Sequence, residues 1–170
     1  MALLKCQLRS KMSFSIIACI GKNRELGAKN DLIFHLKRDM QFFRQTTLNH
    51  PVIMGYNTFK SLPNGALPHR KNYVVTSHPE LLPENVEAVT NLDDFIKNHA
   101  KTEEIFVIGG AKIYQKFLPF ADKIYLTEVD ESAPADVFFP DFDPEKYDKI
   151  VLEKGEENGV KFTISKNIIK

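Results

Sequence analysis

The chain has 170 residues, of which 43% are hydrophobic and 26% are charged. A chain of this length is expected to form one domain with a sizeable hydrophobic core of its own. Its 23 Lys and Arg residues nearly balance its 22 Asp and Glu residues, which leaves a formal net charge of +1. This balance excludes a global field that would favour nucleic acid or an anionic membrane, so the expected partner is a small molecule.

The two cysteines, Cys6 and Cys19, are too few for a disulfide framework, and no Cys/His cluster has the spacing of zinc ligands. We therefore expect a reducing, cytoplasmic location and no metal site. Residues 1–12 carry positive charge but no apolar run long enough for a secretory signal, and they are interpreted as an N-terminal extension before a domain at residues 13–170. No run of roughly eighteen apolar residues predicts a membrane span.

Eight segments rich in β-branched and apolar residues predict strands, at residues 14–20, 52–54, 72–76, 86–89, 105–108, 123–129, 150–153 and 160–168. Helical patterns lie between several of them, at residues 36–47, 58–62, 92–100 and 111–118. The alternation indicates βαβ units and therefore a mainly parallel sheet that is covered on both faces. Asn158-Gly159 separates the last two strand patterns and favours a hairpin, which makes the last strand antiparallel.

The expected fold class is therefore α/β. It consists of one domain with a mixed, mainly parallel sheet of about eight strands and an antiparallel C-terminal strand, flanked by about four helices. The acidic, proline-containing segment 130–144 is expected to be a long surface connection.

Residues 21–35 form a long connection without clear periodicity, in which Gly27 can supply a positive φ angle. Loops of this length in small domains are usually binding loops or lids. An ordinary disordered excursion is the alternative.

In the predicted helix at residues 36–47, Leu36, Met40 and Phe43 have the spacing of a buried apolar stripe. At 100° per residue, Asp39 lies about 60° from the centre of that stripe, so its carboxylate is directed toward the core side. Such a group is unfavourable unless it meets a donor or takes up a proton, and in a cleft this combination indicates a functional acid. The alternative is a rim carboxylate paired with a basic neighbour on the same helix.

Two predicted strand-to-helix turns carry glycine, at residues 54–58 (MGYNT) and 107–111 (VIGGA). Unpaired backbone N–H groups and the positive end of the helix dipole can bind a phosphate at such turns, and glycine lets the anion come close. Two such turns suggest a dinucleotide. The alternative is that the glycines only permit sharp turns. Because the full G-x-G-x-x-G fingerprint is absent, an ordinary Rossmann fold is not supported.

The order and spacing of short sequence blocks resemble the dihydrofolate reductase family from Ser13 to the C-terminus. Each block alone is modest, and their shared order makes the match specific. The blocks are Ile16-Ile17-Ala18, Leu26-Gly27, Leu36 with Asp39, Pro51-Val52-Ile53-Met54-Gly55 with Thr58, Leu67-Pro68 followed by Arg70-Lys71-Asn72, Val107-Ile108-Gly109-Gly110 with Tyr114, Tyr125-Leu126-Thr127, and Asp136 before Phe139-Pro140.

The resemblance implies an oxidoreductase of one-carbon metabolism that reduces 7,8-dihydrofolate to 5,6,7,8-tetrahydrofolate with NADPH, by hydride transfer to C6 and protonation of N5. Asp39 would pair with N3 and the 2-amino group of the pterin, and Arg70 with the α-carboxylate of the glutamate tail. The implied catalytic residues are Asp39, Thr127 and Phe34. The implied substrate-binding residues are Ile17, Ala18, Asp39, Met40, Phe43, Leu62, Leu67, Arg70, Ile108, Tyr114 and Thr127.

By the same resemblance, Cys19 is a small pocket wall and not a nucleophile. Ser77, His78 and Lys112 are expected to recognise the 2′-phosphate, and Tyr56 stands where the family often has arginine. The implied NADPH-binding residues are Ala18, Cys19, Leu26, Gly27, Asn30, Asp31, Leu32, Gly55, Asn57, Thr58, Thr76, Ser77, His78, Ile108, Gly109, Gly110, Ala111, Lys112, Ile113 and Tyr114.

The largest departure from the family is Leu32-Ile33-Phe34, where Leu-Pro-Trp is usual, and the chain has no Trp. Phe34 can replace the packing of the indole but cannot donate its hydrogen bond to active-site water. Antifolates are expected ligands, and a monomer is expected. Two alternatives stay open. One is the related pyrimidine reductase of riboflavin synthesis, against which Asp39 and Arg70 argue, and the other is a folate- or nucleotide-binding module without turnover.

Overall fold

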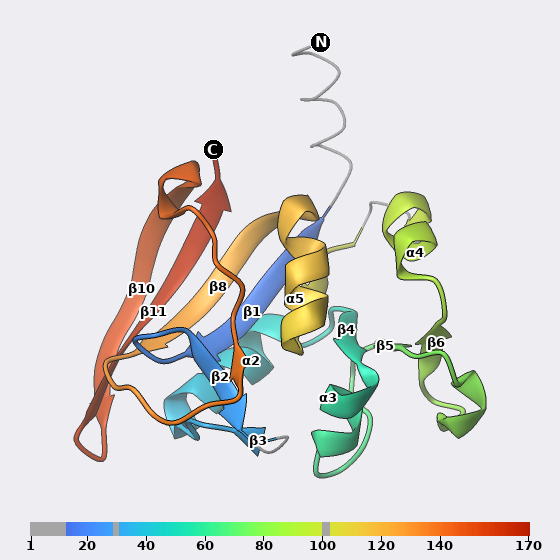
Figure 1. Ribbon diagram of the computed structural model, residues 1–170, viewed down its shortest axis with the longest axis horizontal. Helices are drawn as coiled ribbons and strands as arrows, with labels where there is room; N and C mark the ends of the chain where they lie inside the picture. The colour runs from blue at the N-terminus through green and yellow to red at the C-terminus, as the bar shows by residue number, and fades with distance from the viewer. Residues whose placement is uncertain (1–12, 29–30, 100–102) are drawn as a thin grey trace.

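An eight-stranded sheet runs through the part of the chain that the computed structural model describes, residues 13–28, 31–99 and 103–170 (Figure 1). The strands from β8 to β6 are parallel, and β11 is antiparallel to both β8 and β10. The expected fold class is confirmed. The order across the sheet is β10 (Tyr147–Glu157), β11 (Val160–Ile169), β8 (Ala121–Val129), β1 (Phe14–Ile20), β7 (Ile105–Val107), β4 (Val52–Gly55), β5 (Asn72–Val75) and β6 (Glu87–Val89).

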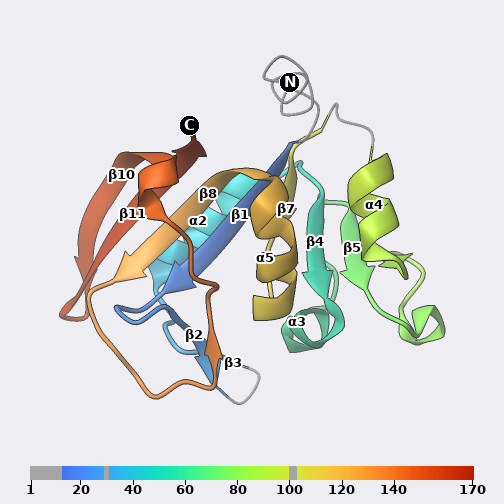
Figure 2. The ribbon, with the colours of Figure 1, turned by 45° about the horizontal axis from the view of Figure 1, so that its top comes forward.

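Helices cover both faces of this sheet, and Figure 2 shows α5 in front of it and α2 behind it. The described residues contain four α-helices: α2 (Lys37–Thr47), α3 (Tyr56–Ser61), α4 (Leu92–Asn98) and α5 (Ala111–Phe117). None of the helices in these ranges is long and apolar enough to span a membrane. Short 3-10 turns lie at Pro79–Leu81, Leu118–Phe120 and Pro144–Lys146.

Strand β1 is buried on both faces because its alternate side chains enter two different cores. Ile16 is fully buried in the core on the α5 side, which also contains Phe117. Ile17 belongs to the core on the α2 side, where Phe43 packs against it. A strand enclosed in this way has a nearly continuous apolar sequence, which is why it was predictable.

The C-terminal hairpin turns at Asn158 and Gly159, whose φ angles of 52° and 81° suit the tight turn predicted there. Strand β10 is longer than the pattern at residues 150–153 because most of its side chains are exposed, so only its central apolar residues give a signal.

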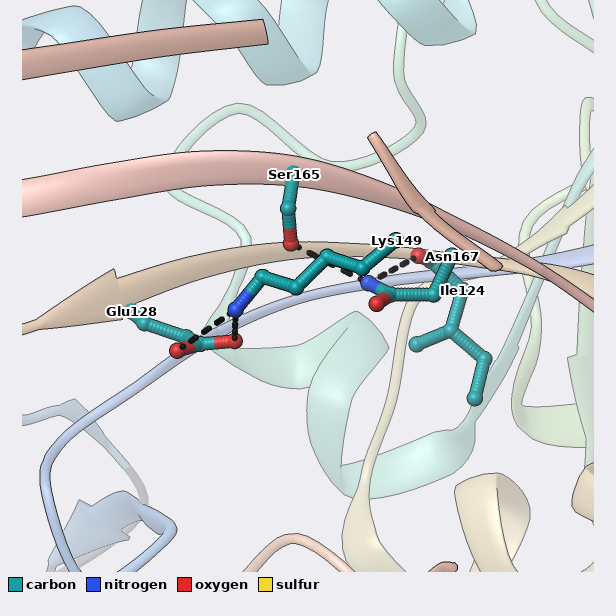
Figure 3. A network of polar contacts seen from close by, with 5 residues as sticks. All are labelled: Ile124, Glu128, Lys149, Ser165 and Asn167. Carbon is teal, nitrogen blue, oxygen red and sulfur yellow. Dashed lines mark hydrogen bonds and ion pairs between the residues drawn. The ribbon is translucent and has the colours of Figure 1, made fainter. Parts of the chain in front are cut away.

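Polar contacts connect β8 to both strands of this hairpin, β10 and β11 (Figure 3). The buried side-chain amide of Asn167 donates to the carbonyl oxygen of Ile124 over 3.0 Å and to Ser165 Oγ over 3.1 Å. Lys149 on β10 forms an ion pair with Glu128 on β8 at 3.2 Å. These contacts fix the register of β8, and Thr127 lies within the strand that they hold.

A second, three-stranded antiparallel sheet has the order β3 (Asp31–Leu32), β2 (Glu25–Ala28) and β9 (Val137–Phe138). It joins the two segments that were expected to be connections, since the backbone N–H of Asp136 donates to the carbonyl oxygen of Gly27 over 3.1 Å. Strands of two to four residues carry no periodicity, so backbone pairing between distant segments was invisible in the sequence.

Candidate active site

Asp39 lies in the first turn of α2, where the helix dipole favours a carboxylate. The helix follows Leu36, a buried residue that packs with Val129 and so places the start of α2 against β8. Thr127 on β8 is 1% exposed, and its hydroxyl donates to Asp39 Oδ1 over 2.6 Å. Arg38 instead pairs with Glu153. The carboxylate therefore faces the sheet and meets a buried hydroxyl rather than its basic neighbour.

The electrostatics of Asp39 depend on two side chains of the sheet beneath it. Burial raises the pKa of the Asp39 carboxyl above its ordinary value, and hydrogen bonds from Thr127 and Cys19 act in the opposite direction. Cys19 on β1 lies opposite Thr127 in the register of the two parallel strands. Burial, followed by the negative charge of Asp39, raises the pKa of the Cys19 thiol far above its usual range. Cys19 is therefore a protonated thiol and not a thiolate nucleophile.

An apolar cluster next to Asp39 gathers five of the residues that the resemblance assigns to substrate. They come from β1, α2, the end of α3, the loop before β5 and the end of β7, and are Ile17, Phe43, Leu62, Leu67 and Ile108. Ala18 belongs to the other core, on the α5 side of the sheet.

Met40 does not belong to the buried stripe of α2, and that expectation is wrong, because its side chain is 61% exposed. Phe42 takes the place in the stripe and packs with Tyr125 at a ring-centroid distance of 6.2 Å. The face of the helix that packs against the sheet is thus rotated relative to the face that was expected from Leu36, Met40 and Phe43. Met40 lies one residue beyond Asp39 on the open side of the helix.

Arg70 lies at the far end of α2 from Asp39. Its guanidinium donates to the carbonyl oxygens of Pro68 at 3.1 Å and Arg44 at 3.5 Å, and its buried Nε has no hydrogen-bond partner. Burial, followed by the charge of Arg44, lowers the pKa of Arg70. Two cationic side chains thus lie together, and their N–H groups can donate hydrogen bonds to an anion.

The two glycine turns lie side by side at the carboxyl ends of the parallel strands. The N–H of Gly55 donates to the carbonyl oxygen of Gly109 over 2.9 Å. Gly109 has a φ of 130°, and its peptide bond to Gly110 is cis. A Cβ atom on Gly109 or Gly110 would lie 3.5 or 3.6 Å from Thr58 Oγ1. The glycines therefore leave a cradle of backbone and one hydroxyl, whose surface a side chain would fill.

Helix α5 follows this cradle and brings Ala111, Lys112, Ile113 and Tyr114 to it. Ile113 lies close enough to Gly55 that a Cβ there would be 3.3 Å from its Cγ1. Tyr114 is 4% exposed, and its hydroxyl donates to the carbonyl oxygen of Ile17 over 2.7 Å. Burial, followed by the charge of Asp39, raises the pKa of Tyr114. Lys112 is exposed.

The remaining candidate cofactor residues lie around the same edge of the sheet. Asn57 is exposed at the start of α3, and Thr76, Ser77 and His78 follow the end of β5. The N–H of His78 donates to Thr76 Oγ1 over 3.0 Å, and His78 Nδ1 lies 3.2 Å from Glu80 Oε1. Loops at the carboxyl ends of parallel strands are the usual ligand-binding edge of such sheets.

Residues 21–35, the segment that was expected to be a binding loop or lid and is called the lid below, are divided between two short strands and the core. Leu26 and Gly27 lie in β2, Asp31 and Leu32 form β3, and Asn30 lies outside the described residues. Phe34 is half-buried in the cluster that also contains Cys19 and Leu36. Its Cε2 atom would be 2.9 Å from a Cβ on Gly21, so the ring packs directly against the start of the lid.

Two features of the site were not foreseen. The first is the hydrogen bond between Cys19 and Asp39, which becomes visible only when the register of β1 and β8 is known. The second is Glu25 in the lid, which is 2% exposed and accepts a hydrogen bond from the N–H of Asn23 over 3.1 Å. No sequence signal identifies a buried carboxylate in so short a strand. Within the described ranges, no group of three or more His, Cys, Asp or Glu side chains could hold a metal ion.

Comparison with known proteins places these features in a family. A family model described as dihydrofolate reductase matches residues 13–167. The chain is 38% identical to the dihydrofolate reductase of Bacillus subtilis over 85% of each protein. It is 37% identical to that of Buchnera aphidicola from Acyrthosiphon pisum over 84% of this chain and 88% of the relative.

Among solved structures, the fold matches a dihydrofolate reductase from Enterococcus faecalis complexed with NADP(H) and RAB-propyl. The TM-score is 0.83 at 24% identity, and the match covers 93% of this chain and 96% of that one. The strand order, the half-buried Asp39 and the glycine cradle lie inside the matched region of the family model. The chain belongs to the dihydrofolate reductase family.

Proposed function

We propose that this member of the family reduces 7,8-dihydrofolate to 5,6,7,8-tetrahydrofolate with NADPH at a site that extends from Asp39 to Arg70. The observation that carries the proposal is the half-buried Asp39 carboxylate, which accepts a hydrogen bond from the buried Thr127 hydroxyl over 2.6 Å beside an apolar cluster. A pterin presents a ring N–H and an amino group in one plane, and a carboxylate can accept from both. Relatives that are 37 and 38% identical and bear the name dihydrofolate reductase support the same reaction.

The cofactor proposal is supported by the cradle at Gly109 and Gly110, whose surface a Cβ atom would fill. Backbone N–H groups and Thr58 Oγ1 would hold the phosphates there, while Ser77, His78 and Lys112 would contact the 2′-phosphate. NADPH, when bound, supplies the hydride. The Enterococcus faecalis dihydrofolate reductase that shares this fold was solved in complex with NADP(H), which supports this assignment.

The protein contributes orientation and a dry pocket. Asp39 and Thr127 would fix the pterin ring, because both side chains are anchored in the sheet and helix rather than in a loop. Ile17 and Phe43 would exclude water from one side of the ring, and Phe34 would pack over the lid side. Arg70 would bind the carboxylate of the glutamate tail at the far end of α2.

The decisive assay follows the absorbance of NADPH after dihydrofolate is added. The proposal predicts a loss of absorbance that needs both compounds and forms tetrahydrofolate in equal amount. A folded protein that binds NADPH without oxidising it in the presence of dihydrofolate would instead be a nucleotide-binding module. Oxidation with a pyrimidine substrate of riboflavin synthesis but not with dihydrofolate would indicate the related pyrimidine reductase.

We also propose that residues 13–170 form the catalytic domain and that the protein acts as a monomer in the cytoplasm. Cys19 is a free thiol, which suits a reducing compartment. Sedimentation equilibrium should give a mass near 19.5 kDa. A variant that lacks residues 1–12 should keep its turnover.

A further inference from the structure

The thiol of Cys19 is a half-buried group to which the proposed reaction assigns no chemistry. Cys19 on β1 and Thr127 on β8 lie opposite each other in the parallel register, so their side chains emerge on the same face of the sheet. Asp39 lies above both, with Thr127 Oγ1 donating to its Oδ1 over 2.6 Å. The Cys19 thiol makes a second side-chain hydrogen bond to the same carboxylate.

The direction of this hydrogen bond follows from the protonation state of the thiol. Burial and the neighbouring carboxylate raise the pKa of Cys19 far above its usual range, so the sulfur keeps its proton at neutral pH. A protonated thiol beside a carboxylate is the donor, and the carboxylate is the acceptor. Phe34 cannot contribute a donor at this end of the pocket, and the chain has no Trp.

We propose that Cys19 is a positioning residue for the reduction: its S–H donates to the Asp39 carboxylate and, together with Thr127, fixes the carboxylate and favours its anionic form. The proposal rests on the proposed function for the role of Asp39. The hydrogen bond itself is testable without turnover, so its failure is distinguishable from failure of the proposed function.

The groups that face Asp39 determine what a titration will report. Cys19 from β1 and Tyr114 from α5 are the titratable side chains whose ionisation is coupled to that of Asp39, and Thr127 from β8 is a donor that does not titrate. On α2 itself, Arg38 is paired with Glu153 at 2.6 Å. Because Cys19 and Tyr114 both have strongly raised pKa values, Asp39 is the first of these three groups to lose its proton as the pH rises.

The experiment compares Cys19→Ala with Cys19→Ser in a Cys6→Ala background, which leaves Cys19 as the one thiol of the two in the chain. Alanine removes the donor, whereas serine keeps a hydroxyl on the same carbon. The Asp39 titration is followed by carbon NMR of labelled aspartate, with Asp39→Asn to assign the signal. Cys19→Ala should raise the titration midpoint by about half a unit to one unit, and Cys19→Ser should restore most of that shift.

The apparent pKa of Asp39 in the pH profile of kcat/KM should move in the same direction as the NMR midpoint. An equal midpoint in the parent and in Cys19→Ala would overturn the proposal, whatever the activity of either protein. Purely structural damage from alanine would lower the melting temperature and leave the midpoint in place, which circular dichroism would reveal.

A second measurement needs no substitution at Cys19. In the Cys6→Ala protein, the infrared S–H stretching band should be shifted to lower frequency than that of a free thiol, because a carboxylate is a strong acceptor. Asp39→Asn should move the band back toward the free-thiol position, since an amide oxygen accepts more weakly. A band at the free-thiol frequency in the parent would show that no hydrogen bond is donated.

Discussion

The N–H of Gly55 donates to the carbonyl oxygen of Gly109 over 2.9 Å, so the turn after β4 and the turn after β7 form one surface. Gly109 holds a φ of 130°, a conformation that side chains rarely adopt. A side chain at this position would adopt a strained backbone conformation, and its Cβ would also be in van der Waals contact with Thr58 Oγ1 and the Tyr114 hydroxyl, at 3.5 and 3.6 Å. A substitution at Gly109 is therefore expected to have two effects, one on the stability of the backbone and one on the binding of NADPH.

Gly109→Ala should both destabilise the protein and weaken NADPH binding. Alanine at position 109 would have to adopt the positive φ angle of Gly109, which should reduce the free energy of unfolding by roughly 1–3 kcal/mol. Gly65→Ala is the matched control, since Gly65 also has a positive φ, of 73°, but nothing lies within 4 Å of a Cβ there. Thermal melts should show similar losses in both variants. Fluorescence titration should show a fall in NADPH affinity of about tenfold or more for Gly109→Ala alone; equal affinities would contradict the cradle.

Asp39→Asn should preserve the fold and remove most reductase activity at neutral pH. The amide keeps the shape of the carboxyl and still accepts from Thr127, but it lacks the negative charge that pairs with the pterin. The loss in kcat/KM should be roughly 10- to 150-fold or more, the scale of a charged hydrogen bond of about 1.5–3 kcal/mol. Steady-state kinetics beside circular dichroism measure it. Turnover within twofold of the parent would remove Asp39 from the site.

The same substitution should change how stability depends on pH. The pKa of Asp39 is raised in the folded protein, so the protonated carboxyl contributes stability that is complete below the ordinary aspartate pKa. That contribution is lost as the pH rises through the raised value. The amide introduced by Asp39→Asn does not titrate and has no such loss, so the difference in melting temperature between this variant and the parent should grow in favour of the variant from pH ~4 to ~8. A difference that shrinks over this range would contradict the direction of the shift.

The fold was largely predictable because its strands are buried on both faces. Continuous apolar runs such as β1 identify strands of this kind directly, and the glycine turns mark where they end. The exposed strand β10 was foreseen only at its centre, since exposed positions carry no constraint on hydrophobicity. The pairing of β2 with β9 had no local signal at all.

The side of α2 from which the Asp39 carboxylate projects was predicted correctly, because the helical period alone determines it. The burial of Met40 was wrongly expected, because the contact face of α2 depends on Phe42 and its packing against Tyr125. The contact between Cys19 and Asp39 depends on the register of two strands more than a hundred residues apart, information that spacing along the chain does not contain.

The choice between NADPH and NADH should depend on His78 and Lys112. Either alanine variant should raise the KM for NADPH more than the KM for NADH, because a hydrogen-bond donor to the 2′-phosphate is lost. Glu80→Gln should act in the opposite direction. Glu80 Oε1 lies 3.2 Å from His78 Nδ1, and its negative charge opposes a phosphate there. The KM for NADH is the internal control; equal use of both cofactors by the parent would remove these residues from recognition.

Phe34→Trp should tighten the binding of a diaminopyrimidine antifolate by about two- to tenfold, the scale of one neutral hydrogen bond. Phe34 packs with Cys19 and Leu36 near Asp39, so an indole there places an N–H donor beside water at the pterin end of the pocket. Isothermal titration calorimetry gives the affinity. The new indole also provides a fluorescent reporter, since the parent chain has no Trp.

Phe138→Trp is the matched control for Phe34→Trp, because Phe138 lies on β9, the strand that pairs with the lid, and is 45% exposed. The same change in side-chain volume and chemistry at that position should leave inhibitor affinity unchanged. Phe34 is closely packed, with its ring 2.9 Å from the place of a Cβ on Gly21, so the larger indole should shift the start of the lid and alter single-turnover hydride transfer. A folded Phe34→Trp protein whose inhibitor affinity equals that of Phe138→Trp would show that position 34 makes no contact with the pterin site.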